Sequence, residues 1–286
     1  MSYADKKFKE MCSNILEHGT DTKGEAVRPK WPDGTSAYTI KTFGVCTVYD
    51  LQKEFPALTL RKTGLKSCMD EILWIYQKKS NNIHDLKPHI WDEWADDKGS
   101  IGRAYGYQVA NITPVRLVNG SIQYMDQMDR VLYELKHTPF SRRIKINLWN
   151  VSELDRMRLQ PCCFDLTFNV TDEGKEKLVL NLHLTQRSQD ILAANNWNVC
   201  QYAILLMMVA QASDMIPGKL MHCITDAHIY DRHVPIIKEL LDREEYLAPV
   251  VKLDPSITNF YDFTTDHLIV ENYVAGEQIK NIPIAI

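Results

Sequence analysis

The spacing of apolar residues predicts three helices in the first half of the chain. Near the N-terminus, Phe8 and Ile15 lie on one face of a helix. Residues 64–79 (GLKSCMDEILWIYQKK) predict a largely buried helix, and residues 124–136 (YMDQMDRVLYELK) predict an amphipathic one. The stretch between the last two, residues 109–122, has no clear period and indicates a variable surface excursion.

The second half of the chain is richer in strands. Residues 163–170 (CFDLTFNV) and 177–186 (KLVLNLHLTQ) alternate apolar and polar positions on either side of the turn sequence TDEGKE. This pattern predicts a β-hairpin or two neighbouring strands. The remaining predicted elements are a long apolar helix at 198–214, a strand at 219–230, a helix at 233–246 and short strands in the tail at 248–286.

Helices and strands follow one another without regular βαβ alternation, which favours an α+β fold with a mixed β-sheet packed with helices. The chain has 286 residues and is 45% hydrophobic, enough for one large core. A single domain over residues 1–286 is therefore expected.

Composition and charge narrow the function classes. The longest apolar run is nine residues, from Tyr202 to Ala210, which is too short to span a membrane. The first residues form no secretory signal, and the seven cysteines show no framework spacing, so reduced thiols in the cytoplasm are expected. The net charge of −4 indicates no general attraction to nucleic acid, which is not required as a partner.

Two adjacent cysteines, Cys162 and Cys163, follow a proline in the stretch RLQPCCFDL. They could form a metal site, a strained disulfide, a nucleophile beside an inert thiol, or two core residues. No C-x-x-C occurs, and the histidines do not have zinc-site spacing, so no metal is expected. On an extended strand the two side chains point to opposite faces, so one thiol could meet a cleft and the other the core.

Arginines cluster in two further stretches, SRRIKINLWN at 141–150 and QRSQD at 186–190. The adjacent arginines of the first stretch are expected at the start of a strand. The planar guanidinium donates two parallel hydrogen bonds and therefore suits a phosphate. For any one arginine, a solvated surface position remains the simpler interpretation.

Taken together, these stretches resemble the folate-dependent thymidylate synthases over nearly the whole chain. The resemblance implies a thymidylate synthase-like fold that dimerises through its sheet. The segments that carry it, in order, are FPALTLRKTGLKSCMDEILWIYQ, HIWDEWADDKGSIGRAYGYQ, SRRIKINLWN, LQPCC, QRSQD, WNVCQYA, DAHIYDRH and the terminal IPIAI.

The resemblance also implies the reaction, which is reductive methylation of dUMP to dTMP. The co-substrate 5,10-methylenetetrahydrofolate supplies the carbon and the hydride and leaves as dihydrofolate, without a metal. Cys162 matches the nucleophile of the family, whose thiolate adds to C6 of uracil. Cys163 stands where many relatives carry histidine, so it is not expected to be essential.

The phosphate of dUMP is expected to bind arginines and a serine. Arg187 and Ser188 match the family pocket, and Arg187 is also expected to favour the Cys162 thiolate. Arg142 and Arg143 match residues that reach across from the partner subunit, which implies a homodimer. Arg28 is the N-terminal arginine that best fits the same pocket.

The resemblance assigns the base and the sugar to three side chains. Asn198 matches the residue that reads uracil, because an amide offers both a donor and an acceptor. His228 and Tyr230 match the pair that holds the deoxyribose hydroxyl. Asp190 belongs to the same nucleotide-binding stretch and matches the carboxylate that holds the pterin ring of the folate.

The remaining site residues surround the folate. Glu71 and Tyr105 are expected to organise water for proton transfers. The C-terminal residues 282–286 are expected to close as a lid, with the free carboxylate of Ile286 in a hydrogen-bond network. Two tryptophans, Trp91 and Trp94, match the apolar wall of the folate site. The run AANNWN departs from the family at Ala194 and Asn196, where glycine and proline are common.

Three other functions compete with this interpretation. A dUMP hydroxymethylase on the same scaffold would quench the transferred methylene with water. Trp91 is expected to shield the methylene from water, which favours the synthase. A nucleotide- or RNA-binding regulator would not need Cys162 and Glu71. A cysteine hydrolase would need a histidine base aligned with the thiol, for which the sequence offers no indication.

Overall fold

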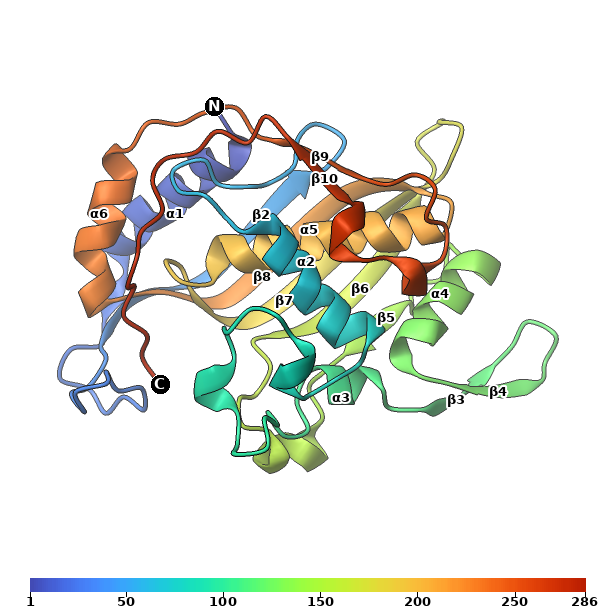
Figure 1. Cartoon of the computed structure of the whole chain (residues 1–286), viewed down its shortest axis with the longest axis horizontal. Helices are drawn as coiled ribbons and strands as arrows, with labels where there is room; N and C mark the ends of the chain where they lie inside the picture. The colour runs from blue at the N-terminus through green and yellow to red at the C-terminus, as the bar shows by residue number, and fades with distance from the viewer.

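A six-stranded mixed sheet forms the centre of the molecule, with strand order β1-β2-β8-β7-β6-β5 (Figure 1). The computed structural model describes residues 1–286. This architecture confirms the predicted α+β fold with a mixed sheet. The strands of the sheet are β1 (Thr20–Asp21), β2 (Thr39–Asp50), β5 (Lys145–Asn147), β6 (Cys163–Thr171), β7 (Val179–Asp190) and β8 (Ile216–Tyr230).

Strands β6 and β7 pair antiparallel around the predicted turn, with Leu166 opposite Leu184. Strands β7 and β8 run parallel instead. Because parallel neighbours require a crossover, the chain between them forms the helix α5 (Asn195–Ala212). The ends of β7 and β8 thereby come together, with Asp190 opposite His228.

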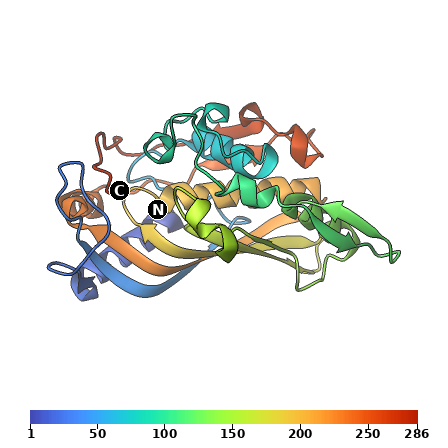
Figure 2. The same ribbon diagram turned by 90° about the horizontal axis from the view of Figure 1, so that it is seen from below.

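Helix α5 consists mostly of apolar residues, and most of its residues are buried. Figure 2 shows the sheet along the lower side of the view, with α5 above it and α2 (Leu65–Ile72) above α5. The main core lies between these layers, and α2 and α5 bury Met69, Ile72 and Leu205 completely. None of the helices has both the length and the apolar character that a membrane-crossing segment requires.

The other predicted helices are present with shifted ends. Helix α2 continues as one π-helical turn (Leu73–Gln77), so the predicted helix at 64–79 is confirmed. The remaining α-helices are α1 (Tyr3–His18), α3 (Gly106–Val109), α4 (Gln127–His137) and α6 (Val234–Asp242). Short 3₁₀ turns cover Ile83–Asp85, Asp92–Trp94, Val151–Arg156, Asp231–His233, Phe260–Asp262 and Thr265–His267.

The helix predicted at 124–136 begins later than expected. Asp126 accepts a hydrogen bond from the backbone N–H of Asp129 at 3.0 Å, and this N-cap starts α4 at Gln127. The residues before it form β4 (Ile122–Met125), which pairs with β3 (Thr113–Arg116). Most of the excursion predicted at 109–122 is therefore a hairpin that projects from the body (Figure 1).

Strand β2, the arginine pair before β5 and the tail strands remain to be compared with the sequence pattern. Strand β2 lies in a region for which no element was predicted. Arg142 and Arg143 precede β5 rather than starting it, because that strand has only three residues. The predicted tail strands are confirmed as the antiparallel pair β9 (Val250–Leu253) and β10 (Leu268–Glu271).

One face of the sheet remains largely accessible. Along β8, Leu220 and His222 face the helices and are buried, whereas Met221 and Cys223 point the other way and are only partly buried. Opposite Cys223 on β2 lies Cys46, and the structure joins the two as a disulfide. The expectation that all seven cysteines are free thiols is therefore wrong for this pair, and the other five are free.

Candidate active site

Cys162 lies directly before β6, at the end of an interior strand of the central sheet. Its backbone N–H donates to the hydroxyl oxygen of Tyr105 at 3.1 Å, and its carbonyl accepts from the backbone N–H of Arg187 at 3.0 Å. The guanidinium of Arg187 in turn donates to the carbonyls of Gln160 (2.7 Å) and Pro161 (3.1 Å). These bonds fix a permanent positive charge beside the cysteine.

Opposing effects act on the Cys162 thiol. Burial raises its pKa, while the charges of Arg187 and Arg28 lower it, and the pKa remains above the ordinary value. Arg28 comes from the loop between β1 and β2, far from Cys162 in sequence, yet its charge acts on the thiol. Both guanidinium groups therefore act electrostatically on the Cys162 thiol, although the sequence predicts this role for Arg187 alone.

Cys163 has a different environment. Its side chain is only 3% exposed, whereas Cys162 is partly accessible. Burial raises the pKa of Cys163 well above its ordinary value, and its thiol lies beside Tyr202 in the core. The two thiols thus occupy different surroundings, as the strand geometry predicts.

Glu71 is a buried carboxylate on α2, with 5% of its surface exposed. The indole N–H of Trp91 donates to its Oε1 at 2.9 Å, and the indole N–H of Trp197 donates to its Oε2 at 2.7 Å. Burial raises the pKa of Glu71, and the two indole bonds partly offset this by favouring the ionised form. Trp197 was not predicted as a site residue.

Aromatic rings surround the same region. The ring centroid of Trp91 lies 5.1 Å from that of Tyr105 and 5.8 Å from that of Trp94. Tyr105 has φ of 43°, which is uncommon for an aromatic residue. This strained backbone accompanies a side chain whose oxygen meets Cys162, and such strain is typical of functional sites.

Asn198 is embedded in a network of side-chain amides. Its Nδ2 donates to Gln201 Oε1 at 2.9 Å, and its Oδ1 accepts from Gln186 and Gln189, each at 3.3 Å. Burial lowers the pKa of His222 to about 4, so this histidine is neutral at pH 7. Because an amide oxygen only accepts, His222 Nε2–H donates to Gln186 Oε1 at 2.7 Å and thereby orients the network.

His228 and Tyr230 lie on the same side at the end of β8, with ring centroids 5.1 Å apart. Asp226 Oδ1 is 2.9 Å from His228 Nδ1 and orients the imidazole. Ser188 lies opposite Asp226 on β7, so the serine and the two rings share one end of the sheet. Burial raises the pKa of Tyr230 to about 12, which keeps its hydroxyl protonated.

Asp190 is the last residue of β7 and is held at a turn. Its Oδ1 accepts from the backbone N–H groups of Leu192 and Ala193, both at 3.0 Å, and lies 3.4 Å from His233 Nδ1. Burial raises the pKa of Asp190, but the nearby charge of His233 and the backbone N–H of Ala193 outweigh it, and the pKa lies below the ordinary value. Asp190 is therefore ionised at neutral pH.

The C-terminal tail returns to the site region along one side of the molecule (Figure 1). The backbone of Ile286 pairs with that of Lys30 through two hydrogen bonds, of 2.8 and 2.9 Å. The carbonyl of Pro283 lies 2.7 Å from His233 Nε2, on the histidine that also contacts Asp190. The tail thus connects the loop that carries Arg28 with the Asp190 turn.

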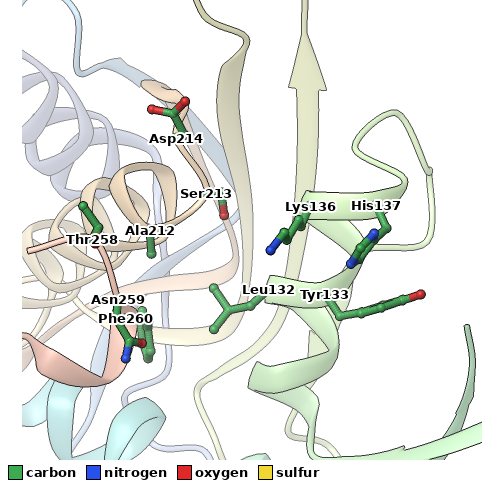
Figure 3. A pocket seen from close by; sticks show the side chains of 10 residues that line it. All are labelled: Leu132, Tyr133, Lys136, His137, Ala212, Ser213, Asp214, Thr258, Asn259 and Phe260. Carbon is green, nitrogen blue, oxygen red and sulfur yellow. The ribbon is translucent and has the colours of Figure 1, made fainter.

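The structure does not bring two predicted residues to this site. Arg142 and Arg143 are exposed, and their side chains make no hydrogen bond or ion pair within the chain. A separate cavity of about 560 Å³ lies between α4 and the C-terminal end of α5 (Figure 3). None of the predicted site residues lines that cavity.

Comparisons with known proteins agree with this arrangement. A family profile described as "Thymidylate synthase" matches residues 6–285. The thymidylate synthase of Bacillus licheniformis is 39% identical over 283 residues, and thymidylate synthase 1 of Bacillus subtilis strain 168 is 37% identical over 283 residues. Each alignment covers 98% of this chain and 98% of the relative.

A solved structure agrees in fold as well as in sequence. Thermostable thymidylate synthase A from Bacillus subtilis superposes with a TM-score of 0.89 at 35% identity, covering 99% of each chain. The sequence profile, the full-length relatives and the fold all lead to the same assignment. The chain belongs to the thymidylate synthase family of methyltransferases.

Proposed function

We propose that the chain converts dUMP to dTMP by reductive methylation, with 5,10-methylenetetrahydrofolate as co-substrate and dihydrofolate as by-product. The observation that carries the proposal is the position of Cys162, whose thiol is partly accessible and influenced by two arginine charges. When bound, the folate supplies the one-carbon unit and the hydride. The residues of the chain supply the nucleophile, the binding groups and the proton transfers.

Cys162 acts as the nucleophile. Its thiolate adds to C6 of the uracil ring, and the electron pair of the C5–C6 double bond moves toward O4, which makes C5 nucleophilic. Arg187 favours the thiolate through its charge and stays in place through its bonds to the carbonyls of Gln160 and Pro161. Cys163 takes no part, since it is buried beside Tyr202.

Phosphate binding draws on Arg187, Arg28 and Ser188, which the chain supplies itself. Arg142 and Arg143 reach the same phosphate from a second copy in a homodimer. Their exposed side chains, without partners in their own chain, support this assignment. The accessible face of the sheet supports pairing of two copies, because β2 exposes the apolar side chains of Phe43 and Val48, and exposed apolar patches mark interaction surfaces.

Base recognition is assigned to the first turn of α5 and sugar recognition to the end of β8. The Asn198 amide donates to O4 and accepts from N3–H of uracil, a pattern that cytosine reverses. Its orientation is supported by Gln201, Gln186 and the neutral His222 behind them. His228 and Tyr230, adjacent on β8, hold the deoxyribose hydroxyl.

The folate is assigned to the aromatic and acidic side chains around Glu71. Trp91 and Trp94, whose rings meet edge to face, offer an apolar wall, and the ionised Asp190 can accept from the N–H groups of a pterin ring. Glu71 and Tyr105 organise water for proton transfer at O4 and C5. The tail that ends at Ile286 closes over the folate and excludes water.

The proposal is tested by incubating the protein with dUMP and methylenetetrahydrofolate. Formation of dihydrofolate, followed by absorbance, should accompany an equal amount of a product with the mass of dTMP. A product with the mass of hydroxymethyl-dUMP, formed without dihydrofolate, would instead identify a hydroxymethylase. Absence of both products with a folded protein would contradict any methylene-transfer activity.

A further inference from the structure

Both oxygens of the buried Glu71 carboxylate are bound by an indole N–H, one from each side. Trp91 binds Oε1 at 2.9 Å, and Trp197 binds Oε2 at 2.7 Å. A carboxylate held at both oxygens cannot rotate about its terminal bond without losing a hydrogen bond. The two donors come from different parts of the chain, Trp91 from the loop after α2 and Trp197 from the first turn of α5.

We propose that Trp197 is a positioning residue for Glu71, which it holds together with Trp91 in one orientation for proton transfer. This inference rests on the proposed role of Glu71. It adds a residue to the site that lies directly before the base-reading Asn198. The same turn of α5 would then orient both the carboxylate and the base.

Neighbouring contacts keep Trp197 in place. Asn196 is buried, and its Nδ2 donates to the carbonyl of Pro56 at 3.0 Å. Its Oδ1 accepts from the backbone N–H of Leu58 at 3.0 Å and from the hydroxyl of Thr63 at 2.7 Å. The asparagine thus anchors the start of α5 to the segment that leads into α2. Anchored in this way, the indole of Trp197 meets Glu71 directly.

The bond has a chemical consequence as well as a geometric one. An N–H donor to a carboxylate favours the ionised form, and burial opposes it. Loss of the Trp197 donor would therefore raise the pKa of Glu71 further. A role in packing alone would depend on the size of the ring and not on its N–H.

The test is the pH dependence of kcat in Trp197→Phe, which keeps an aromatic ring and removes the N–H. One limb of the pH profile of kcat depends on Glu71 and is identified by its loss in Glu71→Gln. In Trp197→Phe, this limb should move to higher pH by roughly one unit. The direction is the same whether the limb reports the ionised or the protonated form, because the pKa itself rises. Trp197→His, which retains a ring N–H, should lie closer to the wild type.

Trp74→Phe is the matched control, because its indole N–H donates to the carbonyl of Asn82 at 2.9 Å and not to Glu71. This variant should lose stability without moving the limb. A wild-type pH profile in Trp197→Phe, with Glu71→Gln impaired, would overturn the inference and leave the proposed function intact. Full activity in Glu71→Gln would overturn the role of Glu71 and this inference with it.

Discussion

At the scale of single residues, Cys162, the proposed nucleophile, is subject to two opposing influences. Burial disfavours its charged form, and the guanidinium groups of Arg187 and Arg28 favour it. Because burial prevails, the neutral thiol predominates at pH 7 and the nucleophilic thiolate is the minor form. This balance leads to a measurable pH dependence of the thiol chemistry.

Alkylation of Cys162 by iodoacetamide should accelerate about tenfold per pH unit through the neutral range, because the thiolate fraction grows in that proportion below the pKa. The rate should rise through the neutral range without a plateau, since burial raises the pKa of the Cys162 thiol above its ordinary value. Arg187→Ala should slow alkylation throughout, because the lost charge raises the pKa further. Peptide mass spectrometry assigns the modified residue. A plateau near pH 7 would contradict this account.

Asn198→Asp tests how the base is selected. Asn198 lies inside the first turn of α5, where Ala194 occupies the N-cap position, so Asn198 does not cap the helix. A carboxyl group can pair with cytosine, and an unpaired buried polar group costs roughly 1–3 kcal/mol. Because two groups are mispaired, the ratio of kcat/KM for dUMP to that for dCMP should fall by roughly thirtyfold to twenty-thousandfold. An unchanged ratio would remove Asn198 from the site.

Sequence motifs supply most residues of the proposed site but not the groups that support them. Cys162, Arg187 and Asn198 lie in short segments that can be recognised one by one. Trp197 was missed, although it precedes Asn198, because its partner Glu71 lies 126 residues away in the chain. Gln201 and His222 were missed for the same reason, since only the packing of α5 against the sheet makes them a network.

At the scale of elements, the C-terminal tail is the least regular part of the site. It contains no helix or strand after Glu271 and is attached by a few hydrogen bonds, including the pairing of Ile286 with Lys30. Segments with few packed contacts open at low free energy, which suits a lid that must admit and release ligands. The tail can therefore be tested separately from the catalytic residues.

Removal of Ile286 should leave dUMP binding nearly unchanged and reduce dTMP formation by roughly a hundredfold, since misplacement of a closing segment has effects of this size. Equilibrium binding of dUMP and initial rates provide the two measurements. Lys30→Ala is the control, because Lys30 contacts Ile286 through its backbone. A truncated protein that forms dTMP at the normal rate would show that the tail is no lid.

The sequence pattern predicted helices better than strands. Helix α5 was predicted because a long apolar run is typical of a buried helix and is longer than most strands. Strand β2 was missed because its residues do not alternate clearly, and Gly44 stands within it with a φ of 77°. The start of α4 was placed too early because Tyr124 and Met125 continue the apolar pattern of the helix while pairing in β4.

At the scale of the whole molecule, the proposed phosphate pocket includes arginines that one chain alone does not bring together. Arg28, Arg187 and Ser188 are associated with the Cys162 region, whereas Arg142 and Arg143 are exposed elsewhere without partners. The accessible sheet face offers a surface on which a second copy can bind. The proposed homodimer would complete each site with arginines from the other subunit.

Mixed dimers test this exchange of residues. Cys162→Ala chains and Arg142→Ala/Arg143→Ala chains should each have little activity alone. After subunit exchange, one site of each mixed dimer should contain an intact Cys162 and two intact arginines, so part of the activity should return. Native mass spectrometry confirms that mixed dimers formed. Confirmed exchange without recovery would contradict a shared site.

The most direct measurement of the central claim compares two neighbouring cysteine variants under one assay. Turnover of dUMP with methylenetetrahydrofolate is followed for Cys162→Ala and for Cys163→Ala, with circular dichroism as the check on folding. The account predicts a loss of roughly a thousandfold or more for Cys162→Ala, which lacks the nucleophile. Cys163→Ala should keep most of the activity, because Cys163 lies in the core beside Tyr202. Retained turnover in a folded Cys162→Ala protein would contradict the account.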